Sequence, residues 1–160
     1  MLKVRDVMSR DIVAFEPEAG LLDAIEVLAE RHISGAPVLV GERIVGVLSS
    51  SDILEFVASN PVALADYGDS ATAGASEEWS ALAGHTVGEA MSGGPACTLA
   101  PDHTVQEAAE LMRTSGIHRV FVVDRERLVG VVSSLDITKA LADHKLGTRT
   151  YVFPDRGPFQ

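Results

Sequence analysis

The chain contains one sequence pattern twice, and this duplication limits its possible folds more than any other feature. Residues 42–53 read ERIVGVLSSSDI, and residues 126–137 read ERLVGVVSSLDI, at an offset of 84 positions. The same offset over residues 17–53 gives 14 identical positions out of 37 without a gap. A single copy of about 55–60 residues buries so little surface that it would be only marginally stable alone. The two copies are therefore expected to pack against each other around a pseudo-twofold axis.

The hydrophobic pattern of each copy predicts the same order of elements: strand, helix, strand, strand and helix. Both copies carry apolar residues at positions i, i+3, i+4 and i+7, which form one face of a helix: Leu21, Ala24, Ile25 and Leu28, then Val105, Ala108, Ala109 and Met112. Thr104 and Glu107 fit a capping box at the start of the second of these helices. Each helix is followed by a hairpin pattern of two β-branched runs: residues 36–40 and 44–48, then 120–123 and 128–132.

The remaining elements complete an α+β (mixed α/β) fold of two tandem β-α-β-β-α repeats. Short opening strands are expected at residues 12–14 and 96–98, and closing helices that begin near Ser51 and Leu135. The predicted domains are repeat 1 at residues 1–59, an Ala/Gly/Ser-rich linker at 60–84, repeat 2 at 85–145 and a tail at 146–160. The linker is expected to hold a short helix near residues 77–82, with Trp79 as an anchor.

Charge and composition argue against several classes of function. The formal net charge is −10, and such an acidic surface repels a phosphate backbone, so no nucleic-acid partner is expected. The first 13 residues have dispersed charges and no apolar core, which predicts no signal peptide. No apolar run is long enough to span a membrane. Cys97 is the only cysteine, so no disulfide framework is expected. Together these features favour a cytoplasmic protein.

No constellation of catalytic residues stands out, and the chain is not expected to be an enzyme. The five histidines are scattered without metal-ligand spacing, so neither a metal site nor a cofactor is expected. The sequence contains no P-loop, no GxGxxG stretch and no nucleophile elbow. An activity on a nucleotide is therefore the weakest of the alternatives.

The Ser-x-x-Asp sequence after each second hairpin strand is the strongest candidate for a site. Ser49 with Asp52, and Ser133 with Asp136, lie where a strand turns into a helix. A carboxylate at this place can accept two hydrogen bonds from a ribose diol. Free backbone N–H groups at a helix start also favour a phosphate. The same residues form an ordinary N-cap, and the two interpretations are compatible.

The ordered set of these features resembles the CBS domain, which is named after cystathionine beta-synthase. The set comprises the helix-strand-strand unit, Gly-x-x-Ser-x-x-Asp after the second strand and a V-x-(D/E)-x-M opening, over residues 4–58 and 87–143. Two copies in tandem resemble a CBS pair, or Bateman module. The resemblance implies two clefts related by the pseudo-twofold axis and a role in sensing adenosine-containing ligands. AMP, ADP and ATP are the first candidates, and NAD or S-adenosylmethionine are alternatives.

The resemblance also implies which residues line the clefts. Asp52 and Asp136 hold the ribose, with Ser49 and Ser133 beside them. The turn before the first hairpin strand of each copy flanks adenine: Ile33, Ser34, Gly35, Ala36 and Pro37, then Ile117, His118 and Arg119. Val13 and Cys97, from the opening strands, supply further wall or belong to the ordinary core.

His118 and Arg119 are the candidates for phosphate contacts, because a guanidinium can donate two hydrogen bonds to one phosphate. Alternatively, Arg119 is a solvated residue at a strand edge and His118 a satisfied turn residue. These two residues replace Ser34 and Gly35 of copy one, so the two clefts are not expected to be equivalent. Phe121 stands where copy one has proline, and its ring could stack on a base or fill the pocket.

From these features we expect a stand-alone regulatory module that forms a homodimer. It would pass a conformational change to an unknown effector protein in trans when an adenine nucleotide binds. The main alternative is an oligomerisation or scaffold module in which the Ser-x-x-Asp motifs only cap helices.

Overall fold

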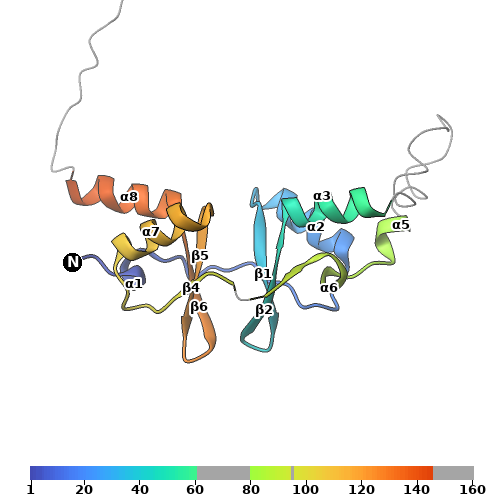
Figure 1. Ribbon diagram of the computed structural model, residues 1–160, viewed down its shortest axis with the longest axis horizontal. Helices are drawn as coiled ribbons and strands as arrows, with labels where there is room; N and C mark the ends of the chain where they lie inside the picture. Colours follow the sequence, from blue (N-terminus) through green and yellow to red (C-terminus); the bar gives the residue numbers. More distant parts are fainter. Residues whose placement is uncertain (61–79, 95, 146–160) are drawn as a thin grey trace, which may run out of the picture.

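The computed structural model of the chain describes residues 1–60, 80–94 and 96–145. Two similar halves lie side by side, each with a small sheet and helices packed on it (Figure 1). The elements in chain order are α1 (Val4–Val7), α2 (Leu21–Glu30), β1 (Gly35–Val40), β2 (Arg43–Ser49), α3 (Ser50–Ser59), α5 (Ser80–Ala83), α6 (Val87–Ala90), β3 (Ser92–Gly93), β4 (Thr98–Leu99), α7 (Val105–Ser115), β5 (Arg119–Asp124), β6 (Arg127–Ser133) and α8 (Ser134–Lys145). This order confirms the predicted mixed α+β fold of two tandem repeats.

Each half is built on an antiparallel hairpin, β1–β2 in the first half and β5–β6 in the second, as expected. The two hairpins share one register, in which Gly35 lies opposite Ser49 and Arg119 opposite Ser133. Each half has its own hydrophobic core between its hairpin and its helices. The first core contains Leu21, Ala24, Leu28, Ala36, Val38, Leu48 and Val87, and the second contains Val4, Val105, Ala108, Met112, Val120, Val122, Val132 and Ile137.

The predicted helix face is confirmed in α2 and α7 except at Ala109. The residues at i, i+3 and i+7 are buried in both helices. At i+4, however, Ile25 is only partly buried and Ala109 is exposed. The i+4 residue lies at the edge of the stripe that faces the sheet, so the short side chain of Ala109 stays in solvent.

The start of α7 has the predicted capping box. The Glu107 N–H donates to Thr104 Oγ1 at 3.1 Å, and the Thr104 N–H donates to the Glu107 carboxylate at 2.7 Å. The backbone hydrogen bond from Thr104 lowers the pKa of the Glu107 carboxyl below its ordinary value. The equivalent helix α2 begins at Gly20 without a side-chain cap, which is the weaker start that its sequence indicates.

The opening strands are shorter than expected and lie one or more residues further along the chain. In the first half, residues 12–14 form no strand, and a single parallel bridge joins Phe15 to Val38. In the second half, β4 pairs with β5 only through Thr98 and Leu99. A proline follows two residues after each contact, at positions 17 and 101, and proline has no N–H with which to extend the ladder.

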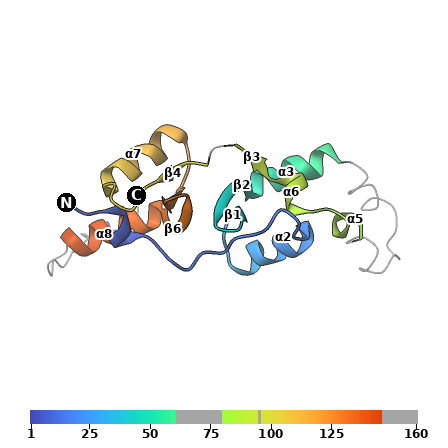
Figure 2. The same cartoon turned by 90° about the horizontal axis from the view of Figure 1, so that it is seen from below.

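The opening segment of each sequence copy packs on the half that the other copy mainly forms. The first helix, α1, packs on the second half, where Val4 is fully buried. Ser9 and Val131 of β6 exchange two backbone hydrogen bonds, of 2.8 and 3.0 Å. In return, α6 and β3 pack on the first half, with Val87 in its core and β3 paired with β2. Figure 2 shows the blue N-terminal segment beside α8. Each half therefore needs residues from both sequence copies.

Gly46 and Gly130 make room for the exchanged segments. A Cβ atom at Gly46 would lie 2.7 Å from the Ser92 carbonyl oxygen and 2.8 Å from the Met91 sulfur. At Gly130, the nearest atom would be the Met8 sulfur, at 2.5 Å. The glycine of each Gly-x-x-Ser-x-x-Asp motif is thus explained by the close approach of a segment from the other copy.

Replacing Gly46 with alanine is expected to lower the free energy of unfolding by about 1–3 kcal/mol, the usual range for overpacking. A backbone carbonyl cannot rotate away as a side chain can, so β3 would have to shift away from β2. Urea unfolding followed by circular dichroism measures the loss. Gly93→Ala is the matched control on the facing strand, because a Cβ at Gly93 would meet nothing within 4 Å. Equal losses in the two variants would contradict this explanation.

The hairpin tips connect the halves across the boundary between them, which we call the seam. The Leu128 N–H donates to the Glu42 carbonyl at 3.0 Å, and Arg127 forms an ion pair with the Glu42 carboxylate at 2.5 Å. A second ion pair joins Arg43 to Glu126 at 3.8 Å. The two ion pairs occupy equivalent positions of the two copies, so the pseudo-twofold axis relates them. All four side chains are exposed, and each pair contributes at most about 1 kcal/mol.

The predicted linker and tail lie largely outside the described residues. Trp79, residues 61–78 and residues 146–160 belong to this part of the chain. The short helix expected near residues 77–82 overlaps α5. The domain boundaries stay predictions.

Candidate functional site

Both Ser-x-x-Asp motifs cap the helix that follows them. In the first motif, the Ser49 N–H and hydroxyl both donate to Asp52 Oδ2, at 2.7 and 2.6 Å, and the Asp52 N–H donates to Ser49 Oγ at 3.2 Å. Ser133 and Asp136 repeat this arrangement with distances of 2.7, 2.7 and 3.2 Å. The structure confirms the capping interpretation, and only the Oδ2 atom of each carboxylate is used for it.

The second oxygen of each carboxylate has a different environment. Asp52 Oδ1 accepts a hydrogen bond from the Ser92 hydroxyl on β3. Ser9 aligns with Ser92 in the other copy, but its hydroxyl donates to the Asp11 carbonyl instead, at 3.5 Å. Among the described residues, no group donates to Asp136 Oδ1. Ser92 is a site residue that the sequence analysis did not identify, although its match to Ser9 in the opening motifs was a signal.

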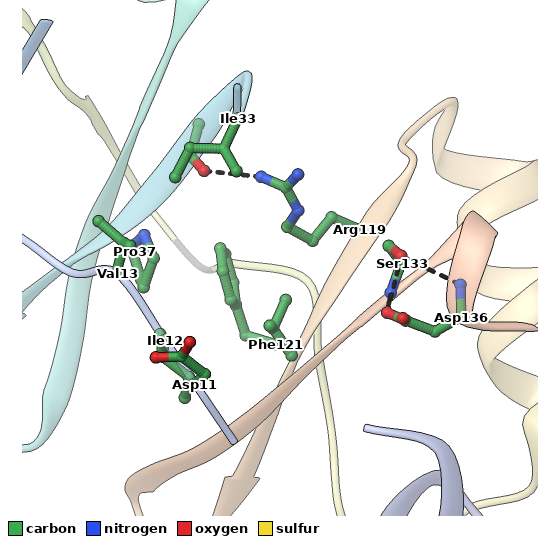
Figure 3. A pocket seen from close by; sticks show the side chains of 11 residues that line it. Asp11, Ile12, Val13, Ile33, Pro37, Arg119, Phe121, Ser133 and Asp136 are labelled. Atoms are coloured by element: carbon green, nitrogen blue, oxygen red, sulfur yellow. Dashed lines mark hydrogen bonds between the residues drawn. The ribbon is translucent and has the colours of Figure 1, made fainter. Parts of the chain in front are cut away.

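Two clefts lie at the seam, and each contains one of the acids. We call them the Asp52 cleft and the Asp136 cleft. Each combines the Ser-x-x-Asp motif of one copy with walls from the other. The Asp52 cleft holds Ser34, Ser49, Asp52, Cys97, Ile117 and His118 of the predicted site residues. The Asp136 cleft holds Val13, Ile33, Pro37, Ser133 and Asp136 (Figure 3). Gly35 and Arg119 line both.

Ala36 is the one predicted site residue that lines neither cleft. Its side chain is buried in the core of the first half. Alternate residues of a strand face opposite sides, so Ala36 and Val38 point into the core while Pro37 faces the seam. The prediction that Ala36 contacts a ligand is therefore wrong for its side chain.

The two clefts differ in size, as their sequences indicate. The Asp52 cleft has a volume of about 460 Å³ and the Asp136 cleft about 180 Å³. Small-molecule sites usually have volumes of about 300–1,000 Å³. Only the Asp52 cleft lies within this range.

Arg119 lies at the seam and connects the halves. Its Nη1 donates to the Gly35 carbonyl oxygen at 2.6 Å, and the residue is half-buried. Arg119 is therefore not the fully solvated strand-edge residue of the alternative interpretation. Among the described residues lining the two clefts, it carries the one fixed positive charge. His118, by contrast, is exposed at the rim of the Asp52 cleft.

The described part of the chain also bears on metal binding and on membrane insertion. Within it, no three His, Cys, Asp or Glu side chains are grouped so that they could hold a metal ion. None of its helices has the length and apolar character needed to cross a membrane.

Comparison with known families and relatives gives consistent matches. The model of the CBS domain family matches residues 4–59 and 87–143. Protein MJ1426 of Methanocaldococcus jannaschii is 32% identical over 158 aligned residues, which cover 88% of this chain and 92% of that protein. The SNF1-related protein kinase regulatory subunit gamma-1 of Arabidopsis thaliana is 30% identical over 88% of this chain and 34% of the relative. The chain spans only 15% of an A-adding tRNA nucleotidyltransferase of Aquifex aeolicus, at 31% identity over 89% of this chain.

Solved structures share the fold over nearly the whole chain. CBSX2 in complex with AMP superposes with a TM-score of 0.71 at 23% identity, covering 91% of this chain and 100% of that one. The CBS domain pair of protein MJ0100, in complex with 5′-methylthioadenosine and S-adenosyl-L-methionine, superposes with a TM-score of 0.68 at 24% identity over 91% and 99%. At identities of 23% and 24%, this likeness shows the fold alone.

Proposed function

This chain belongs to the CBS domain family, and we propose that it is a regulatory module that binds an adenosine-containing ligand between its two halves. AMP, ADP and ATP are the first candidates. The observation that carries the proposal is the Asp52 cleft, which brings a carboxylate, a helix start, apolar walls and Arg119 around one space of about 460 Å³. Such a volume is typical of small-molecule sites.

Each part of the Asp52 cleft suits a different part of this ligand. Asp52 Oδ1 would accept a hydrogen bond from a ribose hydroxyl, because Oδ2 is engaged in the helix cap. The positive end of the α3 dipole favours a phosphate, and the guanidinium of Arg119 would add charge at the same place. Val47, Cys97 and Ile117 offer apolar surface to adenine.

The names of the relatives support a ligand of this class. CBSX2 was solved with AMP, and MJ0100 with 5′-methylthioadenosine and S-adenosyl-L-methionine. The shared moiety is adenosine, which fits a site built around a ribose acceptor and an apolar wall. S-adenosylmethionine and NAD are therefore the alternative ligands. One relative is a regulatory subunit of a protein kinase, which supports a regulatory rather than an enzymatic role.

The proposed module acts in trans on an effector protein. A ligand that prefers one packing of the halves would shift the population toward that packing, and the contacts at the seam would change with it. We also propose that it is a cytoplasmic homodimer. Leu54 on α3, and Leu135 and Leu141 on α8, are exposed apolar side chains, and these helices lie on the same side of the molecule in Figure 1. Light scattering of the purified protein tests the dimer.

Calorimetric titration of the wild-type protein with AMP, ADP, ATP, NAD and S-adenosylmethionine tests the proposed function. At least one of these compounds is expected to bind. At a ligand concentration of about 100 times Kd, binding to the folded state alone stabilises it by about 2.7 kcal/mol, so the melting temperature should rise. No heat and an unchanged melting temperature with all five compounds would contradict the proposal. That result would favour the scaffold alternative, in which the Ser-x-x-Asp motifs only cap helices.

A further inference from the structure

Two differences between the copies fall at the seam, at pseudo-symmetric positions. Arg119 stands where copy one has Gly35, and Phe121 stands where it has Pro37. In the hairpin register, Gly35 is the cross-strand neighbour of Ser49, whereas Arg119 is the neighbour of Ser133. A long cationic side chain therefore begins beside the motif of the Asp136 cleft, while the motif of the Asp52 cleft has a glycine in that place.

The side chains of Arg119 and Phe121 line both clefts, and they lie in the middle of the Asp136 cleft. Arg119 reaches from β5 across the seam to the Gly35 carbonyl, 2.6 Å from its Nη1. Figure 3 shows this side chain above the Phe121 ring, with both between Pro37 on one side and Asp136 on the other. Phe121 is only 6% exposed. The two side chains thus separate the acid from the apolar wall that a nucleoside would have to contact at the same time.

The cleft volumes agree with this arrangement. The Asp136 cleft, at about 180 Å³, is smaller than the usual lower bound of about 300 Å³ for a small-molecule site, and the Asp52 cleft, at about 460 Å³, exceeds it. No described residue donates to the Oδ1 atom of Asp136, but this available acceptor does not compensate for the missing space. Nor does the Ser92 hydroxyl prevent binding at Asp52, because a carboxylate oxygen has two lone pairs and can accept a second hydrogen bond.

We propose that each chain binds one adenosine ligand, in the Asp52 cleft, and that Arg119 and Phe121 close the Asp136 cleft to it. This inference rests on the proposed function and specifies which of the two clefts carries it. The pseudo-twofold repeat is then asymmetric in function: one copy supplies the ribose acceptor, and the other supplies the two side chains that fill the second cleft.

Counting sites by calorimetry tests the inference, with AMP and adenosine as probes. Adenosine has no phosphate, so its binding at Asp52 does not depend on a charge contact with Arg119. The wild type is expected to bind one molecule per chain, with binding lost in Asp52→Ala and kept in Asp136→Ala. In the Asp52→Ala background, the further replacements Arg119→Ala and Phe121→Ala are expected to create adenosine binding in the second cleft, and adding Asp136→Ala should abolish it.

Other outcomes separate this inference from the proposed function. Two sites in the wild type, or binding lost only in Asp136→Ala, would overturn the inference and leave the proposed function standing. A folded Asp52→Ala/Arg119→Ala/Phe121→Ala variant that binds no adenosine would also overturn it. If this triple variant does not fold, Asp52→Ala/Arg119→Ala decides, because adenosine binding that depends on Asp136 should appear once the guanidinium is gone. If neither probe binds, the same count is made with whichever of ADP, ATP, NAD and S-adenosylmethionine binds, and no binding of any of these compounds would overturn both proposals.

Discussion

Replacing Asp52 with alanine is expected to weaken AMP binding about 10- to 100-fold. The substitution removes the carboxylate that would accept from the ribose, and hydrogen bonds to a charged group contribute about 1.5–3 kcal/mol each. One such bond, at Oδ1, corresponds to about 10- to 100-fold, because each 1.4 kcal/mol is about tenfold in affinity. Calorimetric titration with AMP measures the change directly.

Asp136→Ala is the matched control for this experiment. Both acids accept the same two capping hydrogen bonds, at nearly the same distances, so both variants should lose about 1 kcal/mol from the helix cap. Asp52→Ala also loses the exposed hydrogen bond from the Ser92 hydroxyl. Only Asp52→Ala should lose affinity. An equal loss of affinity in both variants would mean that helix capping or a second site, rather than the Asp52 carboxylate alone, governs binding.

Replacing Val4 with aspartate is expected to lower the free energy of unfolding by more than about 4 kcal/mol, because an unpaired carboxyl would be placed in an apolar core. Val4 is fully buried, and its neighbours belong to the second half: Val105, Ala108, Met112, Val120, Val122, Val132 and Ile137. The damage should therefore begin in the half that is remote from Val4 in sequence.

Amide hydrogen exchange of β1–β2 and β5–β6 locates this damage. Protection is expected to fall first in β5–β6, and Val45→Asp on β2 is the control, because Val45 is exposed. A loss of protection confined to β1–β2 in Val4→Asp would show that the N-terminal segment belongs to the first half. That result would contradict the packing of this segment on the second half.

Much of the fold could be predicted because it depends on residues that are close in the chain. The i, i+3, i+7 stripes, the hairpins and the capping boxes are repeated local patterns, and the structure has them close to the expected positions. The side-chain cap of Asp52 on Ser49 spans three residues. Such features need no information about the rest of the molecule.

The sequence-based predictions are wrong where the packing of distant segments determines the structure. Ala109 has the right spacing for a core residue, but it lies at the edge of the apolar stripe and is exposed. Ala36 belongs to the predicted adenine turn, but strand alternation points its side chain into the core. The opening strands are shortened by prolines, and their pairing partners are set by the sheet.

By itself, the sequence determined that two like units exist and that each carries a Ser-x-x-Asp motif at the start of its closing helix. It also determined that the copies differ at two equivalent pairs of positions, 35 and 119, and 37 and 121. Only the tertiary structure decided that the opening segments cross to the opposite halves and that each cleft takes its acid and its facing wall from different copies. It also decided that Arg119 reaches a carbonyl 84 positions away. The physical reason is that local periodicity specifies which face of an element is apolar, whereas the choice of covering segment depends on the packing of parts that are distant in the chain.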